Sequence, residues 1–172
     1  MPITKTLYLI RHAKSSWDDP SQSDFQRSLN DRGLKDSPLM AKLIKGKNII
    51  PDLIISSPAV RALSTAEIFA DEFHYNRNKI ISDERIYEAG MRDLITTIRE
   101  IKDENNTVMI FGHNPGLSNI ANLFGNKFLP EFPTCAVVGI ELKVNSWSEV
   151  ERNCGKIILF EYPKKSLKRS LN

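Results

Sequence analysis

The chain has 172 residues, a length that suits one globular domain with a sizeable buried core. Hydrophobic residues make up 41% and charged residues 26%, a balance that argues against a disordered chain or a fibrous repeat. No apolar run approaches the roughly 20 residues that span a bilayer, and the first residues lack the layout of a secretory signal. We therefore expect a cytoplasmic protein without a membrane role.

The net charge of +3 is concentrated at the C-terminus. Residues 164–172 carry four basic side chains and no acidic one, so the rest of the chain sums to −1. Such a tail can touch nucleic acid or an acidic surface, but it is more often a solvated, irregular terminus. No basic stripe with interleaved aromatic residues indicates a nucleic-acid groove, so we expect no nucleic-acid partner. We divide the chain into one domain over residues 1–163 and a basic tail over 164–172.

Metal and disulfide chemistry find little support in the sequence. Cys135 and Cys154 belong to no C-x-x-C pair, and neither has a histidine at metal-ligand spacing. No two histidines are spaced i, i+4, and no acidic cluster adjoins one of them. We expect two buried thiols, no metal site and no cofactor.

The first predicted elements are a strand, a long loop and a helix. Residues 5–10 are short and β-compatible, and they lead directly into Arg11-His12. Residues 13–29 are rich in Ser, Asp, Gln and Pro and predict a loop, and loops of this length in compact domains are usually functional. Asn30 or Asp31 caps a predicted helix that runs to about Lys47.

A continuous apolar strand and a second helix follow. Residues 53–56 are apolar without alternation, which suits a central strand covered on both faces. Ser57 before Pro58 predicts a helix start, with an N-cap hydroxyl and then proline at the first helical position. This helix is expected to run to about Phe73, near the exposed His74.

The second half of the chain alternates in the same way. Residues 107–111 form the clearest buried strand, and they lead into Gly112-His113. The polar connection between the last two strands predicts an antiparallel hairpin at the edge of the sheet. The remaining expected elements are a strand over 79–82, helices over 92–102 and 117–123, and strands over 136–142 and 156–162. The alternation predicts a three-layer α/β/α sandwich around a mostly parallel sheet.

Polar side chains gather where the predicted strands end, which is where open α/β sheets bind ligands. Arg11 and His12 follow the first strand, Arg61 lies one turn into the helix after the second, and His113 follows the 107–111 strand. Arginine is a fork of donors matched to phosphate oxygens, and imidazole serves as nucleophile when neutral or as donor when protonated. Taken singly, each residue suits an ordinary structural role. Together they predict a phosphoryl-binding pocket.

The motifs around these residues resemble those of the histidine phosphatase superfamily, which includes cofactor-dependent phosphoglycerate mutase. They are more narrowly similar to the SixA-type phosphohistidine phosphatases, over about residues 5–162. The resemblance rests on four motifs in the same order: RHAKSSW (11–17), SLNDRG (28–33), IYEA (86–89) and GHNPGLS (112–118). It implies a phosphoglycerate mutase-like fold.

The resemblance also implies roles for individual residues. His12 would attack phosphorus and carry a transient phosphoryl group, while Arg11, Arg61 and a protonated His113 would hold the phosphoryl oxygens. Water would then hydrolyse the phosphohistidine, with no metal or organic cofactor. Glu88 falls where other branches place an acidic proton donor, but SixA-type members differ here, so its role stays open.

This sequence also departs from the superfamily's pattern at the residue after His12. Ala13 stands where much of the superfamily has glycine. This position requires only a small residue with non-positive φ.

Three functions stay open. The first function is dephosphorylation of phosphohistidine on a protein partner, because the short chain leaves little room for a capping insertion. The second is hydrolysis of a small phosphoester, with the loop over 13–29 deciding between the two. The third is a non-catalytic phosphate-binding module, against which the complete set of core residues argues.

Overall fold

Six strands form one sheet in the order β3-β2-β4-β1-β5-β6 in the computed structural model, which describes residues 4–170. The neighbours β1 and β4, β4 and β2, and β2 and β3 are parallel, whereas β5 and β6 form an antiparallel hairpin at one edge. The predicted mostly parallel sheet with an antiparallel edge hairpin is therefore confirmed. The strands are β1 (Lys5–Arg11), β2 (Leu53–Ser56), β3 (Ile81–Ser82), β4 (Thr107–Gly112), β5 (Val137–Leu142) and β6 (Gly155–Glu161).

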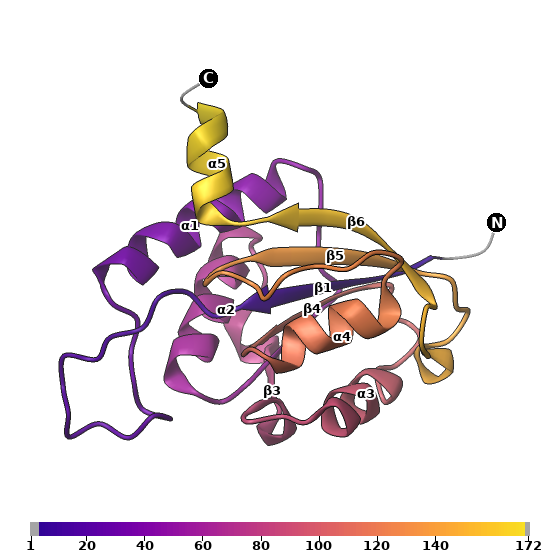
Figure 1. Cartoon of the computed structure of the whole chain (residues 1–172), viewed down its shortest axis with the longest axis horizontal. Helices are drawn as coiled ribbons and strands as arrows, with labels where there is room; N and C mark the ends of the chain where they lie inside the picture. Colours follow the sequence, from indigo (N-terminus) through magenta and orange to yellow (C-terminus); the bar gives the residue numbers. More distant parts are fainter. Residues whose placement is uncertain (1–3, 171–172) are drawn as a thin grey trace.

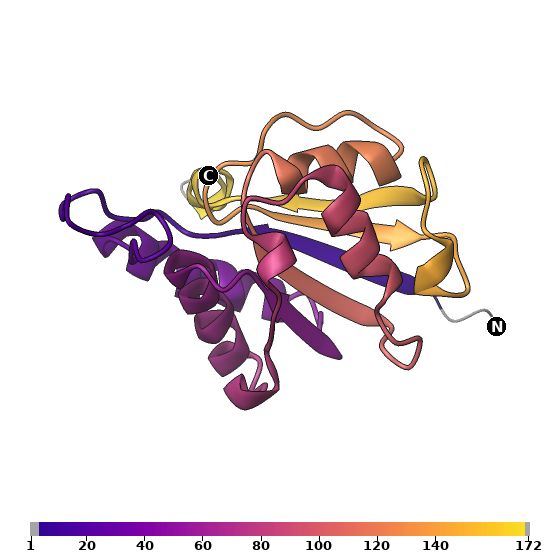
Figure 2. The same ribbon diagram turned by 90° about the horizontal axis from the view of Figure 1, so that it is seen from below.

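Helices cover both faces of this sheet, as Figures 1 and 2 show. The helices α1 and α2 pack on one face and α3 and α4 on the other, so the chain is the predicted three-layer sandwich. Their bounds are α1 (Asp31–Lys45), α2 (Val60–Glu72), α3 (Met91–Arg99), α4 (Gly116–Phe124) and the terminal α5 (Pro163–Ser170). Between residues 4 and 170, no helix has the length and apolar character needed to cross a bilayer.

The central strands are apolar on both faces because each face meets a different core. In β1, Leu7 and Leu9 join the core beneath α3 and α4, whereas Tyr8 and Ile10 join the core beneath α1 and α2. The strand β4 divides its side chains in the same way. Continuous apolar strands of this kind arise where helices cover both sides of a parallel sheet.

The start of α1 follows its predicted cap. The side chain of Asn30 accepts a hydrogen bond from the Gly33 backbone N–H at 2.9 Å, which satisfies one of the free donors of the first turn. Gly33 packs closely against the backbone of Lys14, because a Cβ at this position would lie 2.2 Å from the Lys14 carbonyl oxygen. The glycine therefore lets α1 approach the segment that leaves β1.

The predicted start of α2 is wrong by two residues. The N-cap is Ala59 and the helix begins at Val60, so Pro58 does not occupy the first helical position. The Ser57 hydroxyl accepts from the Ala59 backbone N–H at 3.2 Å and closes a turn ahead of the helix. The Val60 backbone N–H donates to the Phe25 carbonyl at 3.0 Å, a contact with the long loop that no local pattern announces.

The expected irregular basic tail is also wrong for the residues that the structure describes. Residues 163–170 form the helix α5. It is attached to the domain at its first turn, where the Lys165 ammonium donates to the Phe160 carbonyl at 2.6 Å. The Ser166 hydroxyl lies 3.9 Å from the sulfur of Met40 on α1. Residues 171–172 lie outside the described part of the chain.

Replacing Gly33 with alanine is expected to destabilise the protein. Alanine favours a helix by about 1 kcal/mol over glycine, but the clash with the Lys14 backbone forces α1 away from β1. We expect the free energy of unfolding to fall by about 2 kcal/mol or more, measured by equilibrium urea denaturation.

Gly90→Ala is the matched control, because the nearest atom to a Cβ at Gly90 lies 3.9 Å away, on the Asp93 side chain. Equal stability of the two variants would contradict the close approach at Gly33.

Candidate active site

The two predicted site histidines lie at the ends of adjacent parallel strands. Arg11 is the last residue of β1 and pairs in register with Gly112, the last residue of β4. The His12 backbone N–H donates to the Gly112 carbonyl at 3.0 Å, and His113 follows directly. The two imidazole centroids are consequently 5.2 Å apart. The pairing that we expected from the sequence is present.

One nitrogen of His12 is fixed by the backbone. The Nδ1 atom lies 2.7 Å from the carbonyl oxygen of Ala13, which can only accept, so Nδ1 carries the proton. The lone pair of the neutral ring is then on Nε2. The Ala13 N–H donates to the Thr65 hydroxyl at 3.1 Å, and Ala13 does not have a positive φ, as predicted. The backbone therefore leaves Nε2 as the ring nitrogen with a free lone pair.

Burial keeps His12 neutral. Its side chain is 7% exposed, and desolvation, followed by repulsion from His113, Arg61 and Arg11, lowers its pKa to about 3. An imidazole with this pKa is uncharged across the physiological range. It is available as a nucleophile without first losing a proton.

The two arginines reach the histidines from different elements. The Arg11 guanidinium donates through Nη1 to the Phe132 carbonyl at 2.6 Å, and burial lowers its pKa. Arg61 is the second residue of α2, not one turn into it, and it is 5% exposed. Each arginine acts to lower the pKa of both histidines, which places all four residues in one electropositive field. The Nε atoms of both arginines are buried without a protein partner.

The surroundings of His113 favour its neutral form, and the protonation that we expect of it when it holds phosphoryl oxygens stays a prediction. Burial, followed by repulsion from Arg61, lowers its pKa to about 4. Its Nε2 atom lies 2.8 Å from the Ser57 hydroxyl, and its Nδ1 atom is buried without a protein partner. A phosphoryl dianion beside it would reverse the charge balance and favour the imidazolium.

The long loop over residues 13–29 folds back on itself and contacts the site. A β-bridge between Ser15 and Leu29 closes it. At its tip, Asp24 accepts from Arg61 twice, through its backbone carbonyl at 2.6 Å and its carboxylate at 3.0 Å. The Asp24 carboxylate also accepts from Arg27 at 3.1 Å. The loop is therefore part of the machinery that holds Arg61.

Sequence reasoning did not select Asp24 or Tyr87 as site residues. The Tyr87 hydroxyl donates to the Asp24 carboxylate at 2.8 Å, and its ring lies 5.6 Å from that of His113. Although partial burial acts to raise it, hydrogen bonds from Tyr87, Arg61 and Arg27 lower the pKa of Asp24 to about 2. These contacts join three segments that are far apart in the chain, so no local pattern marks them.

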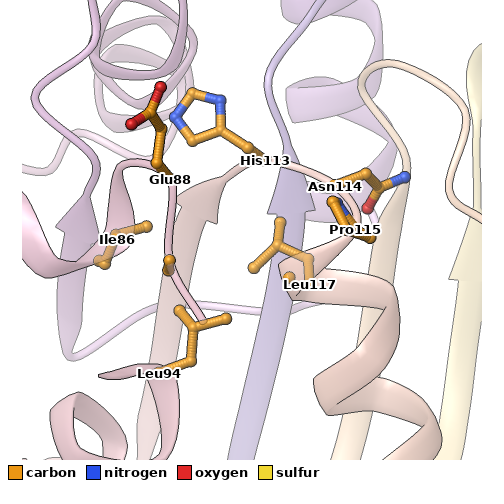
Figure 3. Close-up of a pocket in the computed structure, with 9 residues that line it drawn as sticks. Ile86, Glu88, Leu94, His113, Asn114, Pro115 and Leu117 are labelled. Atoms are coloured by element: carbon orange, nitrogen blue, oxygen red, sulfur yellow. The ribbon is translucent and has the colours of Figure 1, made fainter. Parts of the chain in front are cut away.

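Glu88 borders the same site from the opposite side. It is exposed, has a φ of 53°, and lines a cavity of about 250 Å³ together with His113. Figure 3 shows its carboxylate beside the His113 imidazole, above the apolar side chains of Ile86, Leu94 and Leu117. His12 and the two arginines are outside the lining of this cavity. Glu88 therefore shares a cavity with His113 but not with the other three residues of the predicted site.

Metal-ligand side chains do not cluster in the part of the chain that the structure describes: no group of three His, Cys, Asp or Glu residues there could hold a metal ion. Cys135 and Cys154 are free and buried, as expected.

This arrangement is suited to binding and transferring a phosphoryl group. A neutral nucleophile is held by the backbone, and two permanent cations and a second imidazole surround it. Phosphoryl transfer depends mainly on positioning and on neutralising the charge of the equatorial oxygens. The site has a group for each of these tasks.

Solved structures share the fold of this chain. A 27% identical crystal structure of a candidate SixA phosphohistidine phosphatase from Agrobacterium tumefaciens superposes with a TM-score of 0.78, over 92% of this chain and 98% of that one. The protein histidine phosphatase SixA in complex with tungstate gives a TM-score of 0.80 at 20% identity, over 94% and 99% of the chains, which shows the fold alone.

Relatives in sequence point to the same family. An uncharacterized chloroplast protein of Arabidopsis thaliana is 29% identical over 157 residues, which cover 86% of this chain and 71% of the relative. A 2,3-bisphosphoglycerate-dependent phosphoglycerate mutase of Bifidobacterium longum is 32% identical over 40% of this chain and 29% of its own. The model of the histidine phosphatase superfamily (branch 1) matches residues 7–128. This chain belongs to the histidine phosphatase superfamily.

Proposed function

We propose that this phosphatase removes the phosphoryl group from phosphohistidine on a protein partner, with His12 as its nucleophile. The observation that carries the proposal is the locked tautomer of His12, which directs Nε2 into a site surrounded by Arg11, Arg61 and His113. The likeness to SixA structures supports the phosphohistidine substrate. We also propose a cytoplasmic location.

In the first step, Nε2 of His12 attacks phosphorus and the bond between phosphorus and the substrate nitrogen breaks. The departing imidazole takes up a proton from solvent water, and the phosphoryl group becomes bonded to His12. Arg11 and Arg61 hold the equatorial oxygens, and His113 donates once the dianion has raised its pKa. Because these cations meet the charge, we propose that the reaction needs no metal.

In the second step, water attacks phosphorus and the bond to Nε2 breaks. Inorganic phosphate leaves, and His12 returns to its neutral form with Nδ1 still bonded to the Ala13 carbonyl. A group near His113 must accept the proton of the attacking water. Glu88 is the carboxylate that shares the cavity with His113, and we propose it for this role and for protonating poor leaving groups.

The phosphoenzyme is the sharpest test of the nucleophile. Wild type incubated with a radiolabelled phosphoryl donor and quenched in alkali should hold acid-labile, alkali-stable phosphate, and His12→Ala should hold none. We expect turnover of His12→Ala to fall by roughly 10⁴-fold or more, because no other group can take over the covalent step.

His74→Asn is the matched control, since His74 is an exposed histidine with a φ of 55° that asparagine tolerates. It should label like wild type. Labelling that persists in His12→Ala, or a wild type that neither labels nor hydrolyses a chromogenic phosphoester, would show the proposal to be wrong.

A second candidate is a phosphatase for a small phosphoester, favoured by the cavity between Glu88 and His113. An alkoxide leaves far less readily than an imidazole, so ester hydrolysis needs an acid that phosphohistidine hydrolysis needs much less. Glu88→Gln should therefore lower kcat on phosphoesters by roughly 10²-fold and act far more weakly on phosphohistidine. A substrate panel with high turnover on one metabolite and none on phosphohistidine would select this candidate.

Asp24 is expected to act as a positioning residue through Arg61. Asp24→Asn keeps the backbone carbonyl bond but removes the charge that holds the guanidinium, and kcat/KM should fall by roughly 10- to 100-fold. The negative charge of Asp24 also favours the imidazolium of His113, so its removal should move the pKa of His113 below about 4, as measured by NMR titration.

Asp19→Asn is the control on the same loop, because the Asp19 carboxylate bonds Ser21 within the loop. A wild-type rate and an unchanged His113 titration in Asp24→Asn would show that Asp24 does not position Arg61.

A further inference from the structure

A groove between α1 and α5 lies near the end of the sheet at which β1 and β4 carry His12 and His113. Val137 of β5 pairs with Ile10 near the end of β1 on one side and with Glu161 at the end of β6 on the other. The strand β6 therefore finishes at the same end of the sheet as β1, and α5 begins there. Figure 1 shows α5 and α1 on the side of the molecule toward which β1 points.

The floor of this groove is apolar. Its volume is about 670 Å³, and buried Met40 lies at its base. Two leucines remain exposed along it, Leu39 of α1 at 51% and Leu167 of α5 at 57%. A pair of exposed leucines flanking a groove between two helices is typical of sites that take the apolar face of another helix.

The rim of the groove is basic. Lys35 and Lys42 of α1 and Lys164 of α5 line it and are exposed. The acidic residue in the lining, Asp36, is 7% exposed and already paired with Arg32 at 3.4 Å. Facing the solvent, the groove is therefore uniformly positive around an apolar centre.

We propose that this groove docks an acidic amphipathic helix of the phosphohistidine-bearing protein substrate. The proposal rests on the proposed function and names the partner's surface: leucine-sized apolar side chains on one face, with carboxylates on both sides. A helix bound here lies beside the end of the sheet that carries His12. A neighbouring helix of the same partner protein can then present phosphohistidine to His12. Charge complementarity of this kind mainly speeds association and selects partners.

The test compares two substrates with a common phosphoryl linkage. One is a phosphotransfer domain with a net negative charge, phosphorylated on histidine with phosphoramidate, and the other is a short phosphohistidine peptide that cannot reach the groove. In the double variant Lys35→Glu/Lys164→Glu, and separately in Leu167→Glu, kcat/KM for the domain should fall by about tenfold. The peptide should be hydrolysed at the wild-type rate, which also verifies folding.

Lys102→Glu/Lys143→Glu is the matched control, because it makes the same charge change at the other end of the sheet, where β1 and β4 begin. The control should hydrolyse both substrates like wild type. Raising the salt concentration should lower kcat/KM for the domain more steeply than for the peptide.

Each alternative result has a separate meaning. A wild type that hydrolyses neither the domain nor the peptide defeats the proposed function, and the docking proposal falls with it. Equal loss in the groove and control variants, or none in either, defeats the docking proposal alone. Sedimentation velocity and binding to anionic vesicles complete the test: self-association or vesicle binding that the groove variants abolish, with domain kinetics unchanged, would assign the groove to a second copy or to a lipid surface instead.

Discussion

The parallel pairing of β1 with β4 is the constraint on which the rest of the site depends. It aligns Arg11 with Gly112, and this register sets His12 against His113 without help from any loop. Because the two faces of both strands pack on different cores, a slip by one residue would move every side chain from the core it fits into the other one. The stability of the core and the relative position of the two histidines therefore rest on the same backbone hydrogen bonds.

The site buries two positively charged guanidinium groups, and burying a charge is unfavourable unless it is paired. Arg61 is almost fully buried, and both arginines have a buried Nε without a protein partner. Unpaired buried charge is costly, and Asp24 offsets part of this cost by accepting from Arg61 and Arg27. The positive charge that Asp24 leaves uncompensated lowers the pKa of both histidines and favours the binding of a dianion.

Local patterns allowed much of this fold to be predicted from the sequence, but not the contacts between distant segments. A pattern of a few residues predicts the apolar strands β2 and β4 and the cap at Asn30. Such a pattern also predicts the strand ends that carry His12 and His113. The start of α2 depends on a bond from Val60 to Phe25, some 35 residues away in the chain. Asp24 has no distinguishing neighbours and acquires its role only when Arg61 and Tyr87 converge on it. The helix α5 was missed because charge dominates its composition, and its attachment comes from packing on α1.

The long loop contacts the site through Asp24, which lies beyond the bridge that closes the base of the loop. The bridge between Ser15 and Leu29 closes the loop at its base, and Gly33 packs α1 against that base. Changes beyond this base therefore leave the backbone bond of His12 in place while they alter the contacts around Asp24. Because Asp24 holds Arg61, and Tyr87 connects it to the segment carrying Glu88, the loop can link recognition of a partner to the charge that surrounds the phosphoryl group. The strands therefore hold the two histidines, and the loop holds Arg61 beside them.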